Sequence, residues 1–154
     1  MSFRKGQAAL DFLMTYGWAI ALVVIIAAVL FALGIFDVSN FTGSRAAGFS
    51  GVAVKGWNMN SAGTMTMKFS NQVGTQIRID GVSIQVGQNI TTLSGLPGTM
   101  NTGEESAVIS TTAGAFGVQT PGTGYTAKVN INYTDTNANF AYTTSGTLTG
   151  RIAG

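Results

Sequence analysis

The stretch FLMTYGWAIALVVIIAAVLFALGIF, Phe12–Phe36, is a run of 25 residues without a single charged side chain. An apolar run of roughly 18 residues or more is long enough to be interpreted as a membrane-spanning helix. The polar side chains of this run lie near its start, and the remainder is apolar on every face, which excludes an amphipathic surface helix. We therefore expect a helix over residues 7–40 that crosses a bilayer with some tilt.

The sequence changes character after about residue 40, where Thr, Ser, Asn and Gly become frequent. Apolar and polar residues alternate there with a period of two, which is typical of strands with one buried face. The clearest alternation lies in Thr64–Ser70, Gln76–Val86 and Thr126–Thr134. Weaker strand candidates are Gly51–Trp57, Ser106–Thr111, Asn139–Thr144 and Gly146–Ile152.

Turn-forming residues separate these segments. Asp80-Gly81 has the composition of a two-residue hairpin turn, and Asp135 lies in the turn-like sequence TDTN. Residues 87–103 and 113–124 are expected to be loops. Short strands at this spacing predict an antiparallel sandwich or barrel.

The expected fold class is α+β, with a long apolar N-terminal α-helix followed by an antiparallel β-sandwich-like globular head. Residues 42–51 are rich in Gly and Ser and are expected to join the helix to the head. A head that occupies residues 41–154 has a normal size for a small sandwich.

The composition excludes several classes of protein. Charged residues make up 9% of the chain, against about 25% in an ordinary soluble domain. Cysteine and histidine are absent, which excludes disulfides, Cys/His zinc sites, Ser-His-Asp triads and Cys-His dyads. The eight basic residues form no run that would neutralise a row of phosphates, so no nucleic-acid partner is expected.

The acidic residues do not form a catalytic pattern. Glu104-Glu105 is the one local acid pair, and neighbours on a strand point to opposite faces. An EF-hand-like spacing of oxygen ligands is absent from the sequence. We expect no enzyme activity, no metal and no cofactor; a cleft that gathers Asp80, Glu104, Glu105 and Asp135 would instead support a secreted hydrolase.

Three sequons of the form N-x-S/T begin at Asn40, Asn89 and Asn132. On an exported protein they are candidate glycosylation sites. Asn89 is the best of the three because it lies in an expected exposed loop. Asn132 lies in an expected strand and needs an outward face, whereas Asn40 borders the helix.

Five aromatic residues of the head are expected to pack in its core. A stacked platform for sugars is the alternative reading of the same residues. They are Trp57, Tyr125, Tyr133, Phe140 and Tyr142.

The first eleven residues contain charges that an ordinary anchor does not explain. Arg4-Lys5 precede the apolar run and would hold the N-terminus in the cytoplasm. A secretory signal peptide fits less well, because its apolar region is about 7–15 residues long. Neither reading explains Asp11, since a carboxylate in an apolar helix is costly unless it has a partner or lies at the headgroup boundary.

The segment KGQAALDFLMTYGWAI, from Lys5 to Ile20, resembles the class III signal sequence of archaeal type IV pilins. The resemblance implies that a membrane prepilin peptidase cleaves between Gly6 and Gln7. Residues 1–6 are then a leader, residues 7–40 the filament-core helix and residues 41–154 the head. Asp11 becomes the fifth residue of the mature chain. Many type IV pilins have Phe first and Glu fifth, where this chain has Gln7 and Asp11.

This resemblance also implies a function and a set of partners. The chain would be a structural pilin subunit, inserted in the cell membrane as a precursor and assembled into an extracellular adhesive filament. Its partners would be other copies of itself, the peptidase, a membrane platform protein and an assembly ATPase. The core positions implied for the filament are Phe12, Trp18, Val24, Ile25, Leu30 and Phe36.

Physical arguments agree with such a filament. Loss of Arg4 and Lys5 leaves six basic and six acidic side chains, so the cytoplasmic charge anchor is removed. In the dry filament core, Asp11 would pair with the α-amino group of Gln7 from a neighbour and so fix register, although cyclisation of Gln7 would remove that amine. The alternative is a single-pass membrane-anchored surface protein with a ligand- or glycan-binding head.

Overall fold

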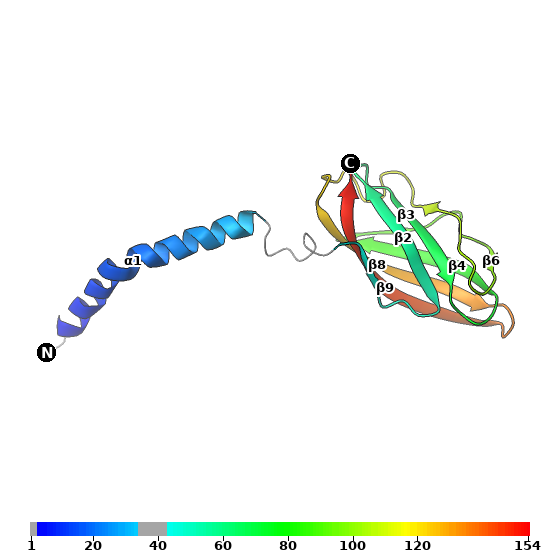
Figure 1. The fold of residues 1–154 in the computed structure, drawn as a ribbon, viewed down its shortest axis with the longest axis horizontal. Coiled ribbons are helices and arrows are strands. Elements are labelled where there is room, and N and C mark those ends of the chain that lie inside the picture. Colours follow the sequence, from blue (N-terminus) through cyan, green and yellow to red (C-terminus); the bar gives the residue numbers. More distant parts are fainter. Residues whose placement is uncertain (1–2, 34–42) are drawn as a thin grey trace. The chain divides into compact units, whose positions relative to one another are not determined.

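The computed structural model describes residues 3–33 and 43–154 of the chain (Figure 1). The chain divides into two compact units, Met1–Val38 and Ser39–Gly154. The α+β class expected from the sequence is confirmed, because one N-terminal helix precedes a head made of strands. Phe36, Asn40 and the last part of the expected helix lie outside the described residues.

Helix α1 (Phe3–Ala32) contains 30 residues, which corresponds to about 45 Å at a rise of about 1.5 Å per residue. Alanine and leucine favour the helix, and no proline interrupts it. The helix begins at Phe3 rather than at residue 7, so the end of the expected leader is helical as well. Gly6 does not stop it, because one interior glycine costs only about 1 kcal/mol.

The described residues of the head form nine strands, and the main strand order in the sheet is β5-β4-β8-β9-β2-β3-β7. Strand β1 pairs with β9, and β6 pairs with β4. The strands are β1 (Arg45–Ala47), β2 (Val52–Asn60), β3 (Met65–Asn71), β4 (Ile77–Val86), β5 (Asn89–Thr92), β6 (Thr99–Met100), β7 (Ile109–Ser110), β8 (Gly124–Asp135) and β9 (Phe140–Ala153).

The sheet curls into two layers that enclose the core. Strands β2 and β3 cross over β4, β8 and β9 (Figure 1). Strand β9 joins the layers, since it pairs antiparallel with β8 along most of its length and parallel with the end of β2 at Met59–Ile152. All other strand pairs in the described residues are antiparallel. The sandwich-like head expected from the sequence is therefore confirmed.

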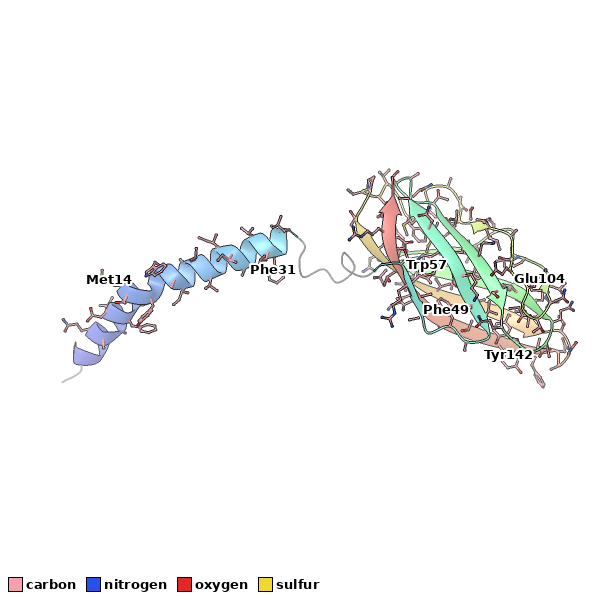
Figure 2. All side chains as sticks on the ribbon, viewed as in Figure 1. Met14, Phe31, Phe49, Trp57, Glu104 and Tyr142 are labelled. Carbon is pink, nitrogen blue, oxygen red and sulfur yellow. The ribbon has the colours of Figure 1, made fainter. Side chains whose placement is uncertain are left out.

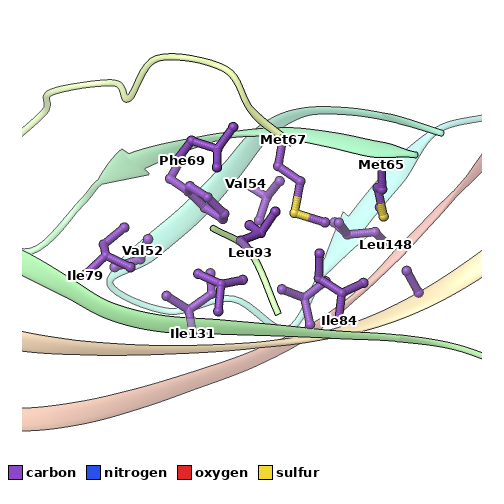
Figure 3. Packing of buried hydrophobic residues seen from close by; sticks show 14 of the residues in the cluster. Val52, Val54, Met65, Met67, Phe69, Ile79, Ile84, Leu93, Ile131 and Leu148 are labelled. Carbon is purple, nitrogen blue, oxygen red and sulfur yellow. The ribbon is translucent and has the colours of Figure 1, made fainter. Parts of the chain in front are cut away.

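Period-two alternation produces the core. In β8, every second residue from Tyr125 to Tyr133 is buried, and those between are exposed. Phe69 and Met67 of β3 face Ile131 and Ile84 of the other layer across the interior (Figure 3). Full burial of one such side chain contributes about 1.5–3 kcal/mol. Removal of these side chains from water therefore stabilises the sandwich.

The hairpin turn expected at Asp80-Gly81 is wrong. Strand β4 continues through both residues, and the pairing with β8 shifts there between Ile79 and Gly81, which makes a β-bulge. A turn would separate Ile79 from Val82, and both are buried in the same core. The chain reverses at Gly87-Gln88 instead, where Gly87 has a φ of 59° that suits a tight turn.

Other boundaries also differ from expectation. Residues 87–103 are not all loop, since β5 and β6 pair with the edge of β4 that does not face β8. The joint at 42–51 contributes strand β1, and the candidate at 106–111 shrinks to Ile109–Ser110. The loop expected at 113–124 is confirmed up to Thr123.

The two weak candidates at the C-terminus form one continuous strand, β9. Gly146 does not break it, because the glycine makes room for a neighbour. A Cβ at residue 146 would lie 2.5 Å from the ring of Phe49 and 2.6 Å from the carbonyl oxygen of Ala47. The position therefore needs glycine for close packing rather than for a turn.

Candidate assembly helix and head surfaces

Helix α1 exposes apolar side chains along its whole described length. Phe12, Trp18, Val24 and Ile25 are all more than half exposed, and Leu30 is half-buried. Figure 2 shows Met14 and Phe31 projecting from the helix. Such a surface is unfavourable in water and needs a cover of lipid or of other chains.

The helix is long and apolar enough to cross a membrane. Its segment Gly6–Ala32 has 27 residues with a mean hydropathy of 2.4, and none of its most apolar window is buried. Length and composition alone support this property.

Three polar residues form a stripe at the start of α1. Gln7, Asp11 and Thr15 are spaced four apart, so they lie on one face of the helix. The Thr15 hydroxyl donates a 2.8 Å hydrogen bond to the backbone carbonyl of Asp11. Among the side chains that the structure describes, none forms an ion pair or hydrogen bond with the Asp11 carboxylate.

The peptide bond expected to be cleaved joins Gly6 to Gln7 in the first turns of α1. Nothing lies within 4 Å of a Cβ built on Gly6. The packing of this chain therefore does not explain why residue 6 has no side chain.

Asp80 lies on the outer face of the sheet with two partners of its own. Arg78 Nε donates to one carboxylate oxygen at 2.7 Å, and Thr134 Oγ1 donates to the other at 2.6 Å. The hydrogen bond from Thr134, followed by that from Arg78, lowers the pKa of the Asp80 carboxyl. This carboxylate is thus used to tie β4 to β8.

Asp135 ends β8 and organises the following turn, as the sequence predicts. Its Oδ2 accepts a 2.7 Å hydrogen bond from Thr75, and its Oδ1 accepts from the backbone amides of Asn137 and Ala138. These hydrogen bonds, led by that from Thr75, lower the pKa of Asp135.

The two adjacent glutamates have separate partners. Glu104 accepts hydrogen bonds from the backbone and side chain of Asn101, and Glu105 forms an ion pair with Lys68 at 3.5 Å. In the residues that the structure describes, no three acidic side chains gather closely enough to hold a metal ion.

Two shallow hollows of the head are lined by no acidic residue. One of about 390 Å³ lies over β9 and contains Lys128 and Asn130, and one of about 220 Å³ lies beside Trp57. Neither brings Asp80 together with the glutamates or Asp135, so neither is the acidic cleft that a hydrolase would need.

The five aromatic residues considered from the sequence differ in burial. Tyr125 and Tyr133 are buried, and burial raises the pKa of Tyr125 to about 12. Trp57 is half-buried, and its ring N–H donates to the Thr149 carbonyl at 3.1 Å. Core packing is thus confirmed for the two tyrosines.

Core packing is wrong for Phe140 and Tyr142, which are 65% and 47% exposed. Both lie at the start of β9, whose second edge is paired in the described residues only at Thr147–Thr149 and Ile152–Ala153. Tyr142 stacks on Tyr133 with ring centroids 5.6 Å apart. Their sequence pattern resembles that of the buried strands, so local alternation gave no signal of their exposure.

The two described sequons lie on different kinds of strand. Asn132 is in the middle of β8 and faces outward, and Asn89 is the exposed first residue of β5 rather than a loop residue. Asn40 lies outside the described residues.

No family model matches the chain, and no curated protein matches it.

Proposed function

We propose that this chain is a structural pilin subunit of the archaeal type IV kind, which forms an extracellular adhesive filament through α1 after removal of residues 1–6. The observation that carries the proposal is the exposure of apolar side chains along the described length of α1, together with Asp11 near its start, whose carboxylate has no partner among the described side chains. No catalytic activity is part of this proposal.

The exposed helix suits two successive environments. In the precursor, lipid covers Gly6–Ala32, and the basic pair before it favours a cytoplasmic N-terminus. Cleavage after Gly6 removes that basic pair, so extraction from the bilayer becomes easier. Once extracted, the helix buries its surface against identical helices, and head-to-tail contacts that do not close produce an open filament.

Asp11 then sets the register of neighbouring subunits. Its carboxylate is four residues from Gln7 on the same helix face, which is roughly 6 Å along the axis. A neighbour displaced along the axis by about that distance brings its Gln7 amine to Asp11. A misplaced neighbour buries both charges without a partner, which costs several kcal/mol, about 3–5 for a broken buried pair.

Mass spectrometry of protein sheared from cell surfaces tests the proposal. An N-terminus at Gln7 is expected in material that pellets as fibres, and the exact mass also shows whether Gln7 is cyclised. An intact Met1 or Ser2 terminus in detergent-soluble material would contradict a pilin. A terminus near residue 35 would indicate a conventional signal peptide.

A second candidate is a membrane-anchored receptor with a glycan-binding head. It is favoured by the exposed rings of Phe140 and Tyr142, because aromatic faces are apolar surfaces of the kind that binding sites use. Full-length protein in detergent, applied to an array of neutral glycans, tests it. Binding that is lost in Phe140→Ala, by a chain that stays monomeric and uncleaved, would support the receptor over the pilin.

A further inference from the structure

We propose that Asn89 is the N-glycosylated residue of the head, that Asn132 remains unmodified, and that the sugar on Asn89 shields the free sheet edge at β5. The proposal rests on the proposed function only in requiring that the head be exported. The two sequons have the same chemistry, so the difference between them comes from their positions in the sheet.

Asn89 lies at an accessible edge. Strand β5 is the last in the strand order and pairs on one side with β4, in the register Val86–Asn89 to Ser83–Thr92. In the part of the chain that the structure describes, its other edge meets no strand. The Asn89 side chain is exposed and has no hydrogen bond to another described residue. A transferase can therefore hold the segment from outside without disturbing the core.

Asn132 lies between two paired strands. Its backbone faces Gly81 of β4 on one side and Thr143 of β9 on the other. Its Oδ1 accepts a 2.8 Å hydrogen bond from Thr143, and Thr134, the third sequon residue, donates to Asp80 at 2.6 Å. The side chains of Asn132 and Thr134 are thus both engaged in hydrogen bonds within the sheet. A transferase would have to pull β8 out of the sheet to use them.

The reaction needs a saccharide linked through phosphate to a lipid carrier. The amide nitrogen of Asn89 forms a bond to the anomeric carbon of the sugar, and the bond from that carbon to the phosphate oxygen breaks. The lipid phosphate leaves with the bonding electron pair, and the amide nitrogen loses one proton. No oxidant or reductant takes part.

The sugar has a physical role at this place. An unpaired sheet edge attracts other strands unless charges, prolines or a cover protect it. Residues 87–92 carry no charge and no proline, and Ile90 is 69% exposed. A bulky hydrophilic group on Asn89 therefore protects an edge that the sequence leaves otherwise unprotected.

Trypsin separates the sequons, because Lys and Arg occur at residues 78, 128 and 151. Peptide 79–128 contains Asn89, and peptide 129–151 contains Asn132. In cell-surface protein, we expect a glycan mass on the first peptide alone. A glycan on the second peptide, on both peptides or on neither would overturn the proposal.

Substitutions in β5 distinguish the effect of losing the sequon from the effect of changing a strand residue. Asn89→Gln and Thr91→Ala should abolish the glycan, whereas Thr91→Ser keeps the sequon and should retain it. Asn132→Gln is the matched control and should leave the glycan unchanged. The unglycosylated variants should also pellet as amorphous aggregate at least twofold more than Thr91→Ser, and equal pelleting would overturn the shielding role.

The N-terminal peptide of the same digest distinguishes a failure of the glycosylation proposal from a failure of the pilin proposal. A chain that begins at Gln7 but carries no sugar on Asn89 contradicts only this inference. A chain that carries the sugar and retains its leader contradicts only the pilin.

Discussion

Thr134 donates a 2.6 Å hydrogen bond to the Asp80 carboxylate, and this contact joins β8 to β4 at the bulge of the sheet. Because the hydroxyl donates to the carboxylate, the hydrogen bond favours the ionised form and lowers the pKa of Asp80. A carboxyl whose pKa is lower in the folded chain stabilises it above the unfolded pKa of about 3.9 and loses that effect as pH falls through the folded value.

Thr134→Val should therefore destabilise the head at neutral pH but not in strong acid. Because the Asp80 side chain is in contact with solvent, we expect a loss of only about 0.5 kcal/mol, which disappears as the pH falls below the unfolded pKa and through the lowered pKa of Asp80. Chemical denaturation at several pH values measures it. Thr143→Val is the control: its hydrogen bond to Asn132 involves no titrating group, so its effect should not vary with pH. Equal pH dependence in both variants would refute the role of Asp80.

Phe69→Ala should destabilise the head strongly. Phe69 is fully buried between the two layers (Figure 3), and truncation of a buried phenylalanine costs about 3–5 kcal/mol. Urea unfolding of the full chain in detergent measures the loss. Val118→Ala is the matched control, because Val118 is 92% exposed and should change stability by less than about 0.5 kcal/mol. A loss below about 1 kcal/mol for Phe69→Ala would mean that the layers do not pack as described.

Gly146→Ala should displace Phe49 and strand β1. The new Cβ would lie within 2.6 Å of both the Phe49 ring and the Ala47 carbonyl, and overpacking of this kind costs about 1–3 kcal/mol. Thermal unfolding followed by circular dichroism checks this. Gly98→Ala, which meets nothing within 4 Å, should leave the transition unchanged. An unchanged transition for both would contradict the close approach at β9.

Asp11→Ala should be cleaved but should not assemble. Loss of the carboxylate removes the pairing that would fix the register, and we expect at least a tenfold drop in sheared filaments. Asp11→Glu should retain most of the yield. Thr15→Val, on the same face of α1, is the control without a charge and should assemble normally. Normal filaments from Asp11→Ala would exclude the register role.

Gly6→Leu should block removal of residues 1–6. The described chain has free space at this position, so a larger side chain should leave α1 folded and interfere only with an external peptidase. Intact mass of the membrane fraction should show the full precursor. Gly17→Ala also meets nothing within 4 Å and should be processed normally. Efficient processing of Gly6→Leu would argue against a leader that ends at Gly6.

Several elements were predictable because their cause is local. The apolar run predicted α1, and alternation predicted most of β3, β4 and β8. The register position of Asp80 was not predictable in this way, because Asp-Gly fits a hairpin turn as well as a bulge. Its role was decided by the pairing of buried residues on both sides of it with one continuous strand, β8.

The candidate functional residues also differ in whether a local sequence pattern predicts them. The stripe of Gln7, Asp11 and Thr15 follows from helical spacing alone, so the sequence contains it. The exposure of Phe140 and Tyr142, by contrast, depends on how far the neighbouring strands extend along β9. No local sequence pattern indicates how far those neighbouring strands extend.

The order of an apolar helix and a β-rich head could be inferred from the amino-acid sequence, because helix and strand periodicities depend on neighbouring residues. Which polar side chains form hydrogen bonds across the sheet, and which stay exposed at its edge, follows instead from the fold. Asn132 is held between two strands while Asn89 lies at an edge, although both have the same sequon. The physical reason is that hydrogen bonds between strands join residues far apart in the chain, and their register follows from the packing of the whole core.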